Sequence, residues 1–132
     1  MCGFFIAMNK VFWLRFVALN GVLSVVLGAF AAHGLEDQLS DRHMATFRTA
    51  VLYHFLHTLA LLAVINLPDQ LAKASLCHWA AVSFAAGIVL FSGSLYLLVL
   101  TNTPTLGMVT PLGGLAFIAG WGLLFFAARR SQ

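Results

Sequence analysis

The side chains best suited to chemistry in this chain are two histidines, His54 and His57, which share a long apolar stretch with Tyr53. Imidazole can bind a metal or haem, and it can exchange a proton near neutral pH. On a helix, Tyr53 and His57 are one turn apart and His54 is three residues from His57, so the three are neighbours. Another apolar stretch holds Asn20 and Ser24. These five residues form the candidate polar cluster.

The elements that carry the cluster are predicted to lie in lipid. Of 132 residues, 61% are hydrophobic and 8% charged, and the mean hydropathy is +0.95. Soluble domains have roughly a quarter of charged residues. Residues 74–128 contain no Asp, Glu, Lys or Arg, which leaves room for two spans of about 20 residues each. We therefore predict one all-α domain over 1–132, a four-transmembrane-helix bundle with spans at about 13–33, 46–66, 77–100 and 111–128.

Short polar or proline-containing stretches separate the predicted spans. Ser40 or Asp41 is the expected N-cap of the second helix. Thr110 is the expected N-cap of the fourth helix, with Pro111 in its first turn. The uncharged stretch 101–108 is expected to be a loop.

The N-terminal region allows two further interpretations. Met8-Asn9-Lys10 looks like an ordinary bacterial start, so residues 1–7 are expected to be dispensable for membrane insertion. Ala29-Phe30-Ala31 follows an apolar stretch and fits a signal-peptidase pattern, so a cleaved signal peptide competes with a retained first span. We favour the retained span.

The basic residues predict the orientation of the bundle. Four spans put both termini on one side of the membrane, and cytoplasmic segments carry the excess of Lys and Arg. The termini and the second connection hold Lys10, Arg15, Lys73, Arg129 and Arg130, whereas the first and third connections hold only Arg42 and Arg48. We expect both termini to be cytoplasmic.

Counting residues along the first two spans from their connection places the polar residues at one depth in the membrane. Pairing the first two spans around residues 37–38 places Asn20 opposite His54 and His57, and we expect Asn20 to contact His57. The leading interpretation is a structural hydrogen bond, worth about 0.6 kcal/mol on average between membrane helices. Handling of a proton or ligand is one alternative, because ionisable groups at membrane depth are often functional, and metal or haem binding is another. No metal ligand set is predicted, because the acidic residues all lie in connections.

Small residues recur along the spans at intervals that allow helices to approach closely. They are Ser24, Gly28 and Ala32 in the first span, Ser83 and Gly87 in the third, and Gly113, Gly114, Gly120 and Gly122 in the fourth. Tight packing within the bundle or in a homo-oligomer is the expected role of these positions, and the lining of a pore is the alternative.

Four sequence motifs occur in an order that resembles the bacterial membrane proteins called domain of unknown function family 423, to which eukaryotic transmembrane protein 256 is similar. They are Gly28-Ala-Phe-Ala-Ala-His-Gly-Leu35, Tyr53-x-x-x-His57-Thr-Leu-Ala60, Phe91-Ser-Gly-Ser-Leu-Tyr96, and Thr110-Pro-Leu-Gly-Gly114 with Gly120-Trp121. The motif residues of interest are Gly28, His33, Gly34, Ser92, Ser94, Tyr96, Pro111, Gly113, Gly114 and Trp121. Ala31 stands where the family pattern has glycine. The resemblance implies a four-span protein of the bacterial inner membrane and brings no activity or catalytic residue with it.

The sequence alone leads to a limited functional hypothesis. The basic residues form no patch of the kind that nucleic acid requires, and no arrangement of a catalytic nucleophile is visible. The leading hypothesis is a non-enzymatic structural or accessory protein of the inner membrane, with the lipid bilayer and a homo-oligomer or larger membrane complex as partners. An oligomeric conduit for protons or small molecules is the alternative hypothesis, and a cofactor- or quinone-binding membrane subunit is the third. No catalytic residue, metal or cofactor is predicted, and the small-molecule ligand is unknown.

Overall fold

The computed structural model describes residues 2–129, with side chains from Asn9 onward, and these residues are mostly helical. The elements are α1 (Cys2–His33), α2 (Asp41–Ile65), α3 (Ala74–Gly87), a π-helical turn η1 (Ile88–Ser92), α4 (Gly93–Thr101), a 3₁₀ turn η2 (Pro104–Met108) and α5 (Thr110–Ala127). Four segments within the described part are long and apolar enough to cross a membrane, namely Asn9–His33, Asp41–Ile65, Ala74–Thr101 and Pro104–Ala127. The prediction of an all-α, four-span membrane protein is confirmed.

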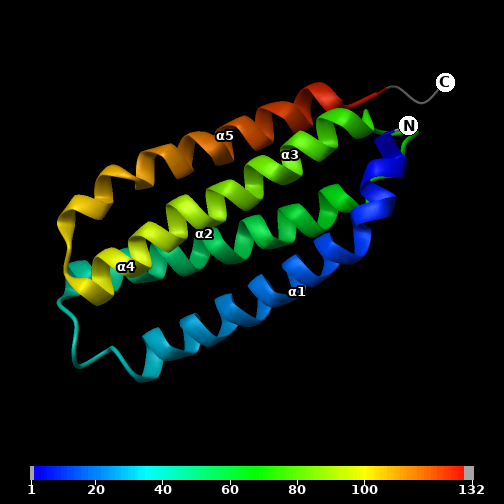
Figure 1. Ribbon diagram of the computed structural model, residues 1–132. Coiled ribbons are helices and arrows are strands. Elements are labelled where there is room, and N and C mark those ends of the chain that lie inside the picture. Colours follow the sequence, from blue (N-terminus) through cyan, green and yellow to red (C-terminus); the bar gives the residue numbers. More distant parts are fainter. Residues whose placement is uncertain (1, 130–132) are drawn as a thin grey trace.

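The helices form a bundle in which neighbours in sequence lie side by side (Figure 1). The segment α3–η1–α4 runs as one rod, with α5 along α3 and α2 on its other side. Helix α1 packs mainly along α2. The described ends of the chain lie at the same end of the bundle, and the α1–α2 connection lies at the opposite end (Figure 1).

Large apolar side chains cover the outside of the bundle. On α1 and α5 these include Val22, Val25, Leu115, Ile118, Phe125 and Phe126, all mostly exposed. Soluble monomers rarely expose such continuous apolar faces. In a bilayer the same faces lie against acyl chains, so the surface fits the predicted membrane environment.

Glycines on α5 allow it to approach the α3–η1 rod closely. A Cβ atom added at Gly113 would overlap the backbone nitrogen of Phe91, and one at Gly120 would overlap the ring of Phe84. In the opposite direction, the ring of Phe117 covers Gly87. These three glycines, which we call the glycine seam, therefore pack inside the bundle rather than against another molecule.

The segment ends differ in part from the sequence-based expectations. Ser40 caps α2 as expected, because its hydroxyl accepts a hydrogen bond of 3.2 Å from the backbone N–H of His43. The expected N-cap role of Thr110 is wrong: Val109 occupies that position, and the Thr110 hydroxyl shares a hydrogen bond of 2.6 Å with Ser94. The Thr110 hydroxyl is thus paired with Ser94 on α4 instead of with a backbone N–H of its own helix.

The stretch 101–108 is not the simple loop that was expected. Asn102 ends α4 in the left-handed conformation (φ 50°), and the N–H of Thr103 then donates to the carbonyl of Leu98. Pro104 begins the 3₁₀ turn, since its fixed φ suits a first helical position. The connection is thus hydrogen-bonded rather than irregular.

The π-helical turn contains a serine, Ser92, that contacts α2. Its widened ring is closed by the N–H of Gly93, which donates to the carbonyl of Ile88. Ser92, fully buried, donates a hydrogen bond of 2.8 Å to the carbonyl of Ala50 on α2. Such turns are single-turn insertions that often mark positions under special constraint. Here the turn carries the hydrogen bond that links the α3–α4 rod to α2.

Backbone pairing closes the end of the bundle at which the chain terminates. The N–H of Lys73 donates to the carbonyl of Ala127, and the N–H of Arg129 donates to the carbonyl of Leu71, both at 2.8 Å. The connection between α2 and α3 is therefore tied directly to the segment that follows α5.

Candidate functional site

A hydrogen-bonded chain of side chains links three helices at the centre of the bundle. The Nδ2 group of Asn20 on α1 donates to the carbonyl of Phe16 at 2.8 Å, which directs its Oδ1 toward His54 on α2. The Nε2–H of His54 donates to that Oδ1 at 2.9 Å. Its Nδ1 therefore accepts from the hydroxyl of Tyr96 on α4 at 3.0 Å. The Tyr96–His54–Asn20 chain is satisfied at every atom by the neutral, Nε2-protonated tautomer of His54.

The expected contact between Asn20 and His57 is wrong, and His54 is the partner of Asn20. Counting residues along the hairpin gives the depth of a residue but not the face of the helix on which it lies. His54 and His57 are three residues apart and so point about 60° apart around the helix axis. His54 faces α1 and α4, whereas His57 faces α5.

Both ring nitrogens of His57 form hydrogen bonds, one with a group that can only donate and one with a group that can only accept. The indole N–H of Trp121 donates to Nε2 at 3.1 Å, so this nitrogen carries no proton. The Nδ1–H then donates to the backbone carbonyl of Tyr53 at 2.8 Å. The arrangement selects the neutral Nδ1-protonated tautomer and leaves no free lone pair for a metal.

Aromatic rings enclose His57. The ring of Phe117 stacks on the imidazole with centroids 3.6 Å apart, and Phe84 and Tyr53 lie at 5.7 and 5.8 Å. The side chain is 6% exposed, against 39% for Tyr53. His57 is thus part of an aromatic core between α2, α3 and α5 in which every polar atom of the imidazole has a partner.

The remaining members of the predicted cluster have local roles. Ser24 is buried, but its hydroxyl donates to the carbonyl of Gly21 in its own helix at 2.9 Å. Tyr53 contributes its backbone carbonyl to His57 and its ring to a contact with Phe91, with centroids 4.7 Å apart. The five predicted residues therefore do not form one site; they belong to two networks and a helix-internal bond.

The residues of the four sequence motifs also have separate structural roles. Ser92, Tyr96 and Trp121 bind α2 through the hydrogen bonds described above, and Ser94 links α4 to the start of α5. His33 is exposed at the end of α1, away from His54 and His57 in the middle of α2. Gly34 lies under the ring of Phe30, where a Cβ atom would be 2.7 Å from the ring.

Reasoning from depth alone did not identify Tyr96 and Trp121 as histidine partners. A helical side chain leans toward the N-terminus of its own helix. The hydroxyl at the end of the long Tyr96 side chain therefore meets His54 at a point displaced along α4 from its own Cα. A usable signal was present in the motifs, because Tyr96 and Trp121 are the polar aromatic residues in them that lie on the spans facing α2.

The described part of the chain shows no set of metal ligands around His54 and His57. Among the residues whose side chains the structure describes, no three His, Cys, Asp or Glu side chains converge on a point. Residues 1 and 130–132, which include Arg130 of the predicted charge pattern, lie outside the described part of the chain.

A double-mutant cycle tests the Tyr96–His54–Asn20 chain. Asn20→Ala and His54→Ala should each destabilise the protein, and the double variant should lose less than the sum by about 0.6 to 1.7 kcal/mol, because the second change removes a bond already broken. The pair Asn20→Ala and His57→Ala is the control and should be additive. Unfolding in mixed detergent micelles measures both cycles. Coupling of Asn20 to His57 instead of His54 would contradict the described pairing.

Comparison with known proteins places these features in a family. Residues 27–114 match the family described as "Protein of unknown function (DUF423)". The chain is 47% identical over 111 residues to the UPF0382 membrane protein YwdK of Bacillus subtilis, covering 84% of this chain and 90% of that protein. It is 40% identical over 123 residues to the UPF0382 inner membrane protein YgdD of Escherichia coli K12, covering 93% of each. No solved structure matches the chain.

The similarity extends over most of the chain and includes the segments that carry His54, His57 and the glycine seam. The protein is a multi-pass protein of the bacterial inner membrane and belongs to the DUF423 family of membrane proteins.

Proposed function

We propose that the protein is a non-catalytic accessory component of the inner membrane, a rigid scaffold that associates with other membrane components. The observation that supports this is the complete engagement of both imidazoles. All four ring nitrogens of His54 and His57 have protein partners inside the bundle. No lone pair or N–H of these rings is left for a substrate.

The same geometry disfavours the conduit alternative. A proton relay needs a group that accepts a proton on one side and releases it on the other. Protonation of His57 at Nε2 would require the Trp121 N–H to leave, and the stacked Phe117 ring covers the imidazole. Losing a hydrogen bond in an apolar core costs about 1–3 kcal/mol, so the neutral state is favoured.

Passive proton flux distinguishes a scaffold from a conduit. The purified full chain is reconstituted into liposomes that contain a pH-sensitive dye, and an external pH step is applied. We expect the internal pH to relax at the rate of protein-free liposomes. Faster relaxation that His57→Ala abolishes would overturn the scaffold proposal, and an absorption band above 350 nm in the purified protein would point to a bound cofactor instead.

Association with other components is tested in native membranes. After mild solubilisation, the chain, with a mass of 14.3 kDa, should migrate in a stable larger assembly on native gels. Migration at monomer size in several mild detergents would remove the accessory role.

The proposed orientation has both termini in the cytoplasm. Lys10 and Arg15 lie in the first half of α1, Lys73 directly precedes α3 and Arg129 follows α5. These helix ends lie at the end of the bundle that holds the described chain ends, whereas Arg42 and Arg48 lie in the first turns of α2, after the α1–α2 connection (Figure 1). The positive-inside bias therefore favours that end as cytoplasmic. A green fluorescent protein fused to the C-terminus should fluoresce, whereas alkaline phosphatase at the same place should be inactive. An active phosphatase fusion would reverse the orientation.

A further inference from the structure

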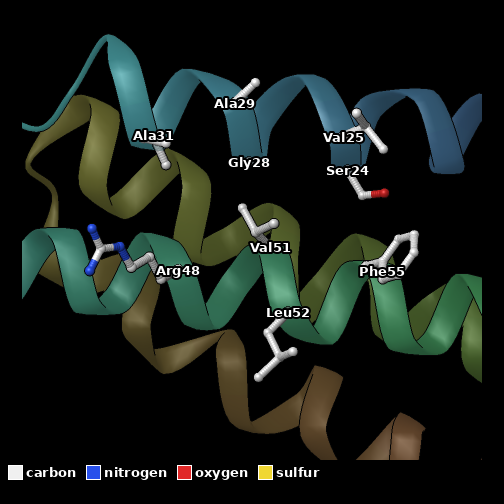
Figure 2. Close-up of a pocket in the computed structure, with 10 residues that line it drawn as sticks. Ser24, Val25, Gly28, Ala29, Ala31, Arg48, Val51, Leu52 and Phe55 are labelled. Atoms are coloured by element: carbon white, nitrogen blue, oxygen red, sulfur yellow. The ribbon is translucent and has the colours of Figure 1, made fainter.

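A groove of about 410 Å³ lies between α1 and α2, on the side of the bundle that these two helices form (Figure 2). Its α1 wall is made mostly of small side chains, and α2 contributes larger apolar ones. The residues that define it are Ser24, Gly28 and Ala32 on α1 and Arg48, Val51 and Phe55 on α2. Grooves of this size accommodate ligands of a few hundred Å³.

The groove faces the bilayer rather than the polar interior. Val25, Leu52 and Phe55, which line it, are all more than 40% exposed. The hydroxyl of Ser24 is turned to the carbonyl of Gly21, so it offers no donor to the groove. The body of the groove is thus apolar and open to lipid.

Arg48 is the charged residue of the lining, and it lies at the end of the groove near the α1–α2 connection (Figure 2). Helix α2 has 25 residues and is about 37 Å long, more than the roughly 30 Å of hydrocarbon. Arg48, seven residues from its start, therefore lies near the boundary between acyl chains and headgroups, and its guanidinium extends toward the connection. A cation at the mouth of an apolar groove is complementary to an amphiphile with an anionic headgroup.

We propose that this groove is a binding site for an anionic phospholipid, with its phosphate on Arg48 and one acyl chain along α1 and α2 between Ala32 and Phe55. The guanidinium group offers paired N–H donors that match phosphate oxygens. The small residues of α1 leave the volume that the acyl chain fills, and the neighbouring Val51 and Phe55 provide apolar contacts. The lipid comes from the leaflet that adjoins the α1–α2 connection.

A second copy of the chain is less well suited to the groove. Copies inserted with the same orientation pack about an axis along the membrane normal, so a two-fold contact through the groove brings both Arg48 side chains to the same depth. Two guanidinium groups close together in a medium of low dielectric repel each other. An anionic lipid neutralises this charge instead.

Thermal unfolding of the purified full chain in detergent tests the choice of lipid. Phosphatidylglycerol and phosphatidylcholine with identical acyl chains are titrated separately. We expect phosphatidylglycerol to raise Tm by about 5 °C more than phosphatidylcholine. Arg48→Gln should remove this difference, Arg48→Lys should keep part of it, and the matched control Arg42→Gln, which lies outside the groove, should keep all of it.

Native mass spectrometry tests the place of the acyl chain. The wild-type chain should retain one phosphatidylglycerol, Ala32→Phe should retain none because the ring fills the groove, and Ala18→Phe on another exposed part of α1 should retain it. Equal Tm shifts with both lipids, or an undiminished difference in Arg48→Gln, would overturn the proposal. A wild-type dimer that Ala32→Phe converts to monomer would identify a second copy as the occupant and would also overturn it.

Discussion

Gly113→Ala is expected to lower the free energy of unfolding by about 3 kcal/mol, the upper range for overpacking a well-packed core. The added methyl group would overlap the backbone nitrogen of Phe91. A backbone cannot move aside by changing a rotamer, so α5 must separate from the π-helical turn. Unfolding in mixed detergent micelles measures the effect.

Gly122→Ala is the matched control, because Gly122 lies on the same helix and a Cβ atom there meets nothing within 4 Å. Alanine favours a helix over glycine by about 1 kcal/mol, so this variant should be neutral or more stable than the wild type. Equal destabilisation by the two substitutions would show that close approach at Gly113 is not what holds α5 to η1.

His57→Ala should destabilise the protein by about 2 kcal/mol, the sum of a lost interhelical hydrogen bond, a lost aromatic contact and a cavity. The substitution removes the acceptor of the Trp121 N–H and the ring that stacks on Phe117. Trp121→Phe, which removes only the donor and part of the ring, should cost about half as much. Thermal unfolding followed by circular dichroism measures both.

His33→Ala provides the control for this series, since the His33 side chain is exposed at the end of α1. Its effect should be within about 0.5 kcal/mol. A loss at His57 no larger than that at His33 would mean that the imidazole does not contribute to the aromatic core. In cells, loss of function in the His57→Ala strain at normal protein abundance would favour a ligand or proton role over the scaffold.

The four-span architecture was predictable because its signals are strong and local. Long apolar segments, the uncharged stretch 74–128 and the polar connections each follow directly from the cost of placing charges in hydrocarbon. The π-helical turn was not predictable, because it lies where contacts between segments are made. Gly113 against Phe91 and Ser92 against Ala50 depend on how α2, α5 and the α3–α4 rod fit together.

The candidate site was predictable only in part: the depth of Asn20 and the histidines was, but their pairing and the partners Tyr96 and Trp121 were not. The depth of Asn20 and the two histidines follows from counting residues along a hairpin, and the structure does place Asn20 and His54 together. The rotation of each helix decides which histidine faces which neighbour, and this rotation depends on the packing of side chains such as Phe84 and Phe117 around His57. A count along the chain contains no information of that kind.

The backbone pairing at the closed end of the bundle has a consequence for biosynthesis. Leu71 and Lys73 leave the ribosome long before Ala127 and Arg129, yet their backbone groups are satisfied by those residues. The bond between Asn20 and His54, by contrast, needs only the first hairpin. The two contacts therefore become possible at different times: the bond between the first two spans can form before α5 is made, whereas the second connection gains its backbone partners only after α5 and the residues that follow it have been made. Until then the N–H of Lys73 and the carbonyl of Leu71 lack the hydrogen-bond partners that they have in the folded bundle.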